Sequence, residues 1–235
     1  MKSRTHCLVY VRTSSRRMPN KAFELIHGRK MYAHVYMRLR EAFENITILT
    51  SDDASDDEFS IELEKEDISY FRGSLKSTLQ RTYDFIKVEK IKSFYRVCGD
   101  SPLYPIDILE QVEKKVQLYG LENWLITNTG KRRYWPKGWS IERVPSSLIE
   151  KAVLSTDKIQ GDEEHLTQWL YRKSKEINLP LLQLPIPEDS INELRLVVDY
   201  HYDLKKMRSI NQKWFDPVYY IKNGSERFAT EECSK

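Results

Sequence analysis

Cysteine is scarce in this sequence, and long apolar runs are absent. Only three of the 235 residues are cysteines, Cys7, Cys98 and Cys233. Their odd number and wide spacing suit neither a disulfide scaffold nor a zinc site, so we expect free thiols in a reducing compartment. No run of about 18 apolar residues occurs, and we therefore expect no membrane-spanning helix. The apolar stretch near the N-terminus is too short for a signal peptide, which predicts a cytoplasmic protein.

The sequence also lacks a large excess of either positive or negative charge. Lys and Arg number 38 against 35 Asp and Glu, which gives a net charge of +3. A nucleic-acid-binding domain usually has an isoelectric point above ~9 and clustered basic side chains, so we expect no nucleic-acid partner. Basic residues do gather near the N-terminus, at Arg12, Arg16, Arg17, Lys21, Arg29 and Lys30. Such a segment can attract a ligand that carries phosphate groups.

Apolar segments of strand length alternate with amphipathic helical segments along the chain. We predict strands at 7–11, 46–50, 68–71, 93–97, 124–127 and 194–198. We predict helices at 31–42, 75–87 and 106–118, and a further helix that begins near Asp56 after an acidic, turn-prone run. This alternation predicts an α/β fold in three layers, a mostly parallel sheet flanked by helices.

Two segments interrupt the alternation. Residues 128–144, punctuated by proline and glycine, are predicted to form a loop and a hairpin, and residues 176–193 contain three prolines. We predict a single domain over residues 1–225, with an insertion at 128–170. A flexible tail is predicted at 226–235, because little apolar content follows Ser225.

Candidate site residues follow the predicted strands, because ligands of open α/β sheets bind beside the carboxyl ends of the strands. Residues 12–21 follow the first strand and bring four cationic side chains and three hydroxyl groups. This set suits a triphosphate, although a solvated basic loop has the same composition. Asp100 and Asp199 each follow a later strand. Each could bind Mg²⁺ or cap the next helix, and residue types alone leave both interpretations open.

Two further patterns indicate packing rather than chemistry. Residues 162–165 combine acidic side chains with a histidine, but they lack the two-histidine spacing of a zinc helix. The aromatic residues of the predicted hairpin, Tyr134, Trp135 and Trp139, are more typical of a packed hairpin than of a base-stacking platform.

Four segments carry motifs in the order in which a known family has them. Residues 12–21 resemble Arg-x-x-Ser-Thr-Arg-Leu-Pro-Gly-Lys, and residues 28–35 resemble Gly-Lys-Pro-Met/Leu-x-x-His-Val. Residues 96–103 resemble Arg-x-Thr-Gly-Asp-Cys-Pro-Leu, and residues 194–199 resemble the family's closing strand and aspartate. The sequence thus resembles the sugar-nucleotide cytidylyltransferases, and most closely their spore-coat-polysaccharide-biosynthesis branch, from about residue 8 to residue 204.

The resemblance implies a nucleotide-diphospho-sugar transferase fold, similar to that of A-type glycosyltransferases (GT-A-like). It also implies a direct displacement, in which an acceptor oxygen attacks the α-phosphate of CTP and pyrophosphate leaves. Catalytic roles would fall to Arg16, Lys21 and Asp100, and Mg²⁺ would bind at Asp100 and Asp199. The implied nucleotide-binding residues are Arg12, Ser14, Ser15, Arg72, Ser74, Arg81 and Asp100. The implied acceptor-binding residues are Asn128, Glu142 and His165.

The resemblance further implies a homodimer formed through the inserted hairpin, whose three aromatic residues would be apolar anchors. Departures from the family's motifs concentrate on the acceptor side, where an acidic residue is replaced by Ser140 and Asp-Thr-Pro-Glu-Asp reads Asp-Tyr-His-Tyr-Asp at 199–203. We therefore expect either an unusual sugar, sugar-acid or related acceptor, used in surface polysaccharide synthesis, or a family member with weakened catalysis. One alternative is a nucleotide-binding homologue without transferase activity. The other is an A-type glycosyltransferase. That class has a metal-binding Asp-x-Asp motif, and the acidic run at 51–57 does not have this form.

Overall fold

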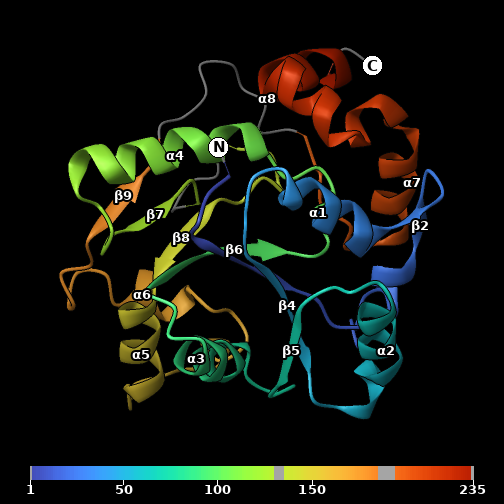
Figure 1. The fold of residues 1–235 in the computed structure, drawn as a ribbon. Helices are drawn as coiled ribbons and strands as arrows, with labels where there is room; N and C mark the ends of the chain where they lie inside the picture. Colours follow the sequence, from blue (N-terminus) through green and yellow to red (C-terminus); the bar gives the residue numbers. More distant parts are fainter. Residues whose placement is uncertain (1, 130–134, 185–193, 234–235) are drawn as a thin grey trace.

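The computed structural model describes residues 2–129, 135–184 and 194–233. Its centre is a seven-stranded sheet with the strand order β5-β4-β1-β6-β8-β7-β9 (Figure 1). The strands are β1 (His6–Tyr10), β4 (Ile46–Ser51), β5 (Tyr70–Gly73), β6 (Ser93–Cys98), β7 (Leu125–Thr127), β8 (Glu142–Pro145) and β9 (Leu181–Gln183). β1 is parallel to β4 and β6, whereas β8 is antiparallel to both of its neighbours. The predicted α/β class and the mostly parallel sheet are confirmed.

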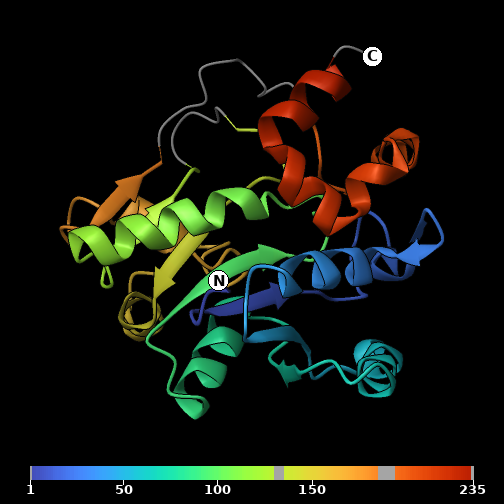
Figure 2. The same cartoon turned by 45° about the horizontal axis from the view of Figure 1, so that its top comes forward.

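Helices cover both faces of the sheet, which gives the three predicted layers (Figures 1 and 2). One apolar cluster joins the sheet to α1 (Met31–Arg40), α2 (Asp57–Lys65), α4 (Ile106–Tyr119), α7 (His201–Ser209) and α8 (Pro217–Cys233). A second cluster joins the opposite face to α3 (Thr78–Val88), α5 (Ser146–Leu154) and α6 (Gln168–Arg172). Short elements complete the fold, namely η1 (Lys21–Phe23), β2 (Leu25–Ile26), β3 (Arg29–Lys30), η2 (Ala54–Asp56) and η4 (Gln212–Phe215).

Local chemistry explains where several helices begin and end. The Ser77 side chain accepts a hydrogen bond from the N–H of Gln80 and caps the start of α3. α4 ends at Gly120, whose φ of 64° is left-handed and suits glycine. The Asp53 side chain caps η2, which leads directly into α2, so the acidic run at 51–57 starts a helix as predicted.

The predicted strand at 194–198 is wrong. These residues form an extended segment with one isolated bridge, from Arg195 to Lys137. Leu194, Leu196 and Val198 are buried in the first cluster, and Val197 is also buried, so the apolar run indicates burial and not sheet pairing. β8 and β9 lie in the two segments where the alternation was interrupted, and neither was predicted as a separate strand.

The C-terminal region also differs from its prediction. A flexible tail was expected after residue 225, but α8 continues through Cys233, and Phe228 and Ala229 are buried. Phe228 packs against Trp139 and Trp214, which attaches α8 to the main core. Among the described residues, no helix combines the length and apolar character that crossing a membrane requires.

Candidate active site

Two aspartates meet at one lysine beside the carboxyl ends of β1 and β6. The Lys21 ammonium lies 2.6 Å from Asp100 Oδ2 and 3.8 Å from Asp199 Oδ1, and it also donates to the carbonyl oxygen of Val198 at 2.9 Å. The N–H of Val198 donates to the carbonyl oxygen of Asp100, which fixes the two chain segments to each other. Asp100 lies 79 residues after Lys21 in the sequence, and Asp199 lies 99 residues after Asp100. The fold thus brings together three side chains that are far apart along the chain.

A glycine permits this close arrangement. A Cβ on Gly99 would lie 2.4 Å from Val11 Cγ2, so no larger residue fits between β6 and β1 without displacing that neighbour. Asp100 follows directly. Its carboxylate is paired with Lys21 and does not cap α4, whose N-cap is Pro105.

Asp199 is surrounded by basic side chains. Besides Lys21, its carboxylate lies 3.2 Å from Arg17, 2.9 Å from Arg195 and 3.9 Å from Lys137. Asp199 does not cap α7. That role falls to Asp203, which accepts hydrogen bonds from the N–H groups of Asp199 and Tyr200 and forms a two-point ion pair with Arg195.

A buried carboxylate shapes the loop that follows β1. Asp56 is fully buried and accepts hydrogen bonds from the N–H and hydroxyl groups of both Thr13 and Ser51. Burial raises the pKa of Asp56, but these four donors outweigh it and hold the pKa below its usual value. Asn20 ends the loop at a φ of 57°, the left-handed conformation that asparagine tolerates.

Four of the predicted phosphate-side residues lie on this loop. Arg12 is paired with Glu164 at 2.6 Å, which connects the loop to the segment before α6. Ser14 and Arg16 are exposed, and Ser15 is half-buried, with its N–H bonded to the carbonyl oxygen of Thr13. The loop therefore presents the Ser14 hydroxyl group and the Arg16 cation to solvent.

Of the other predicted nucleotide-binding residues, Arg72 lies in β5, Ser74 directly follows that strand, and Arg81 lies on α3. Arg72 donates to the carbonyl oxygens of Ser51 and Asp53 and pairs with Asp57. Arg81 is 2% exposed, its Nη1 donates to the carbonyl oxygen of Ser74, and its Nε has no partner. The Ser74 hydroxyl accepts from the N–H of Ser77. Arg72 and Arg81 are thus held in place by the protein itself.

The predicted acceptor-side residues differ in what they can offer a ligand. The Asn128 side chain is buried. Its amide nitrogen donates to the carbonyl oxygen of Trp139, and its amide oxygen accepts from the N–H of Ile141. Glu142 is 2% exposed and paired with Arg96. His165 is exposed, and its backbone N–H bonds to the carbonyl oxygen of Gly161. Of the three, only His165 presents its side chain to solvent.

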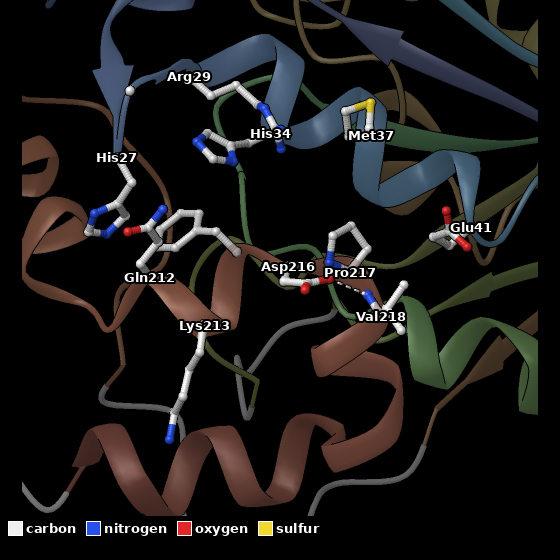
Figure 3. Close-up of a pocket in the computed structure, with 12 residues that line it drawn as sticks. His27, Arg29, His34, Met37, Glu41, Gln212, Lys213, Asp216, Pro217 and Val218 are labelled. Atoms are coloured by element: carbon white, nitrogen blue, oxygen red, sulfur yellow. Dashed lines mark hydrogen bonds between the residues drawn. The ribbon is translucent and has the colours of Figure 1, made fainter.

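A separate cavity of about 770 Å³ lies away from these residues. Figure 3 shows it between α1 and the η4–α8 region. Its lining mixes basic and acidic side chains, including Arg29, Lys213, Glu41 and Asp216, and includes none of the predicted site residues. Buried His34 donates a hydrogen bond from Nε2 to the carbonyl oxygen of Ile26, which connects this wall to the β2–β3 turn.

Comparison with known proteins identifies the family. A family model described as cytidylyltransferase matches residues 6–129, more than half of the chain. The chain belongs to the cytidylyltransferase family. The spore coat polysaccharide biosynthesis protein SpsF of Bacillus subtilis is 24% identical over 216 residues, which cover 88% of this chain and 85% of that protein.

Solved structures of other family members share the fold. A cytidylyltransferase from Leptospira borgpetersenii superimposes with a TM-score of 0.80 at 24% identity, covering 94% of each chain. A CMP:2-keto-3-deoxy-manno-octonic acid synthetase complexed with CTP superimposes with a TM-score of 0.61 at 13% identity, covering 88% of this chain and 98% of that one.

The candidate site also includes residues that the sequence analysis did not name as site residues. Arg17, Lys137 and Arg195 contact Asp199, and Asp203 holds Arg195. Arg17 lies in the basic loop and could have been included on that ground. Lys137 could not, because the position of the 128–144 segment relative to Asp199 depends on tertiary structure.

Proposed function

We propose that this cytidylyltransferase moves CMP from CTP to a small sugar-like acceptor and releases pyrophosphate, for the synthesis of a surface polysaccharide. The observation that carries the proposal is the meeting of Lys21, Asp100 and Asp199 beside a basic loop. The family and the SpsF relative support CTP and polysaccharide synthesis. The acceptor oxygen would form a bond to the α-phosphorus, and the bond between that phosphorus and the bridging oxygen to the β-phosphate would break.

In this reaction the protein's contribution is positioning and charge neutralisation. The exposed loop hydroxyls and Arg16 are available to the triphosphate oxygens, and Lys21 can exchange a carboxylate partner for a phosphate. Arg72 and Arg81, which the protein already holds, would contact the nucleoside side. His165 would face the acceptor.

Mg²⁺ is the proposed cofactor, and the residues present fit it. Asp100 and Asp199 both reach one cationic group, the Lys21 ammonium, so their oxygens can also reach a shared divalent cation. No cluster of three or more acidic, His or Cys side chains suited to a metal occurs within the described ranges. Two carboxylates suffice, because Mg²⁺ commonly takes one or two and completes its shell with phosphates and water. When bound, it would neutralise charge on the triphosphate.

Two further expectations belong to this proposal. We propose a cytoplasmic location, where CTP is available, and a homodimer. Trp139 is fully buried between Phe228 and the core, so it is not an interface anchor as predicted. Trp135 is half-buried, and Tyr134 lies outside the described residues. Light scattering would decide the oligomeric state, and a monomer at all working concentrations would contradict the dimer.

The first experiment is a thermal-shift measurement with CTP, UTP, ATP and GTP, each with and without Mg²⁺. A ligand at 100 times its Kd stabilises the folded state by ~2.7 kcal/mol, which for this chain length corresponds to a shift of roughly 5–11 °C. We expect that shift for CTP with Mg²⁺. Pyrophosphate release with an acceptor panel then tests transfer. CTP binding without pyrophosphate release from any acceptor would indicate a nucleotide-binding homologue that lacks the transfer activity.

A further inference from the structure

The cavity between α1 and the η4–α8 region is lined by two histidines that each keep one ring nitrogen unbonded (Figure 3). His27 donates from Nε2 to the carbonyl oxygen of Ile210 at 2.9 Å, and His34 donates from Nε2 to that of Ile26 at 2.7 Å. No described residue bonds to the Nδ1 atom of either ring. His34 is only 5% exposed, and folded proteins rarely leave so buried a polar atom without a partner.

Two arginines near these rings have no carboxylate partner among the described residues. Arg29 is an exposed cavity residue that forms neither an ion pair nor a side-chain hydrogen bond there. Arg38 is fully buried on α1, donates from Nη2 to the carbonyl oxygen of Trp214, and lies 4.1 Å from the centroid of the Tyr220 ring. Burial lowers the pKa of His34 to about 4, and both arginines add to the shift, so the ring is neutral at pH 7. This end of the cavity therefore lacks negative charge.

The rest of the cavity offers polar groups and one aromatic ring. Figure 3 shows Glu41 at the end opposite to the two histidines. The side chains of Glu41 and Gln212 are exposed and have no hydrogen-bond partner among the described residues. The ring centroid of Phe215 lies 5.0 Å from that of one histidine and 4.9 Å from that of the other. The volume of about 770 Å³ falls within the range of roughly 300–1,000 Å³ that is usual for small-molecule sites.

We infer that this cavity is a second ligand site, which binds a small phosphorylated polyol. Its phosphate group would accept from the Arg29 guanidinium and from His27 Nδ1, and a hydroxyl group would donate to the Nδ1 lone pair of His34. A phosphate monoester carries close to two negative charges at pH 7, which suits an end with two unpaired arginines better than a single negative charge does. The cavity includes none of the reaction-centre residues, so this ligand is neither the nucleotide nor the acceptor, and the inference does not depend on the proposed function.

Calorimetric titration of the wild-type chain tests the ligand class. The probes are three polyol phosphates (glucose 6-phosphate, ribose 5-phosphate and glycerol 3-phosphate), with glucose and inorganic phosphate as the separate halves. We expect at least one polyol phosphate to bind about tenfold more tightly than either half. Saturating CTP with Mg²⁺ should leave that Kd within about threefold, because the sites are separate. Binding of none of the three, equal binding of inorganic phosphate, or competition by CTP would overturn the inference.

Nitrogen-15 NMR of the histidine side chains locates the bound probe. Before addition, His34 should show the neutral ring with the proton on Nε2, as its bond to a carbonyl oxygen requires. The polyol phosphate should shift the Nδ1 signals of His27 and His34. His165 and His201 are internal controls, since the first is the proposed acceptor-side residue and the second lies two positions after Asp199. Shifts at these two controls without shifts at the cavity histidines would place the ligand at the reaction centre and overturn the inference.

Two matched variants test the phosphate end of the site. Arg29→Gln removes an exposed, unpaired guanidinium, and we expect the Kd for the polyol phosphate to rise about tenfold with the Kd for CTP unchanged. Arg40→Gln removes the same charge from the exposed end of α1, where the guanidinium lies over the Tyr36 ring and outside this cavity. It should leave both Kd values within about twofold. An unchanged Kd for the polyol phosphate in Arg29→Gln, or an equal loss in Arg40→Gln, would overturn the assignment.

Discussion

Replacing Asp203 by asparagine tests how the protein holds Asp199. Asp203 is 3% exposed and accepts four hydrogen bonds, two from the Arg195 guanidinium and two from the N–H groups of Asp199 and Tyr200. Asp203→Asn keeps the size and one main-chain acceptor but removes the charge. Breaking a fully buried ion pair costs 3–5 kcal/mol. Because Arg195 keeps 22% of its side chain exposed, we expect Asp203→Asn to lower the free energy of unfolding by less than this, about 2–3 kcal/mol.

The sign of the pH dependence follows from the direction of the pKa shift. Burial raises the pKa of Asp203, but Arg195 and the two N–H groups outweigh it and hold the pKa below its usual value. A carboxylate with a lowered pKa in the folded state stabilises the protein above its unfolded pKa of ~4, and that contribution disappears as the pH falls through the folded value. The difference between wild type and variant should therefore be full at pH 7 and shrink in acid.

Urea unfolding of the wild type, Arg195→Gln, Asp203→Asn and the double variant measures the coupling free energy. We expect about 1.5–3 kcal/mol at pH 7, and for Asp203→Asn a fall in Tm of roughly 4–12 °C. A coupling below ~0.5 kcal/mol, or a destabilisation by Asp203→Asn that is the same at pH 7 and pH 3, would refute the reasoning.

Three further perturbations have defined outcomes. Lys21→Met should lower pyrophosphate release about 100-fold or more with Tm nearly unchanged, and unchanged turnover would contradict its place at the reaction centre. Gly138→Ala should lower the free energy of unfolding in urea by at least ~2 kcal/mol, because φ is 108° and the new Cβ would lie 2.3 Å from the carbonyl oxygen of Leu196. Gly120→Ala is the matched control. Its φ is 64° and its Cβ would meet open space, so we expect a loss of about 1 kcal/mol. Thr13→Ala removes a hydroxyl donor from buried Asp56 and should cost about 1–2 kcal/mol, measured in the same way.

Parallel strands made part of the site predictable. Because β1 and β6 run in the same direction, the residues that follow them meet at one edge of the sheet, and this rule places Lys21 and Asp100 together. Asp199 arrives at the same edge although no strand precedes it. The segment 194–198 was predicted as a strand because it is an apolar run of strand length, and its apolar side chains are indeed buried, although it forms only one isolated bridge.

The antiparallel strand β8 made the rest unpredictable. Because β8 runs antiparallel to β6, its first residue, Glu142, lies toward the carboxyl end of β6 although it begins its own strand. A search for residues that follow strands cannot find such a position. The resemblance to the family supplied Glu142, but not its partner. Arg96 and two hydroxyl groups occupy both oxygens of the Glu142 carboxylate. These contacts form only because β6, β8 and α6 pack together, and no local sequence pattern predicts them.

The charge balance around Asp199 is compatible with the divalent cation that we propose. The network around Asp199 contains four basic side chains, Arg17, Lys21, Lys137 and Arg195, and three carboxylates, Asp100, Asp199 and Asp203, which leaves one positive charge in excess. A nucleoside triphosphate carries roughly four negative charges near pH 7. Without a metal, its arrival would leave about three of them uncompensated in this network, and a divalent cation would reduce that number to about one. Arg16 on the same basic loop is exposed and could contribute a further positive charge. The same balance explains why Asp199 can be bound by several cations at once before any ligand arrives. A cation that left Asp199 for a phosphate oxygen would free a carboxylate oxygen that could hold the proposed metal.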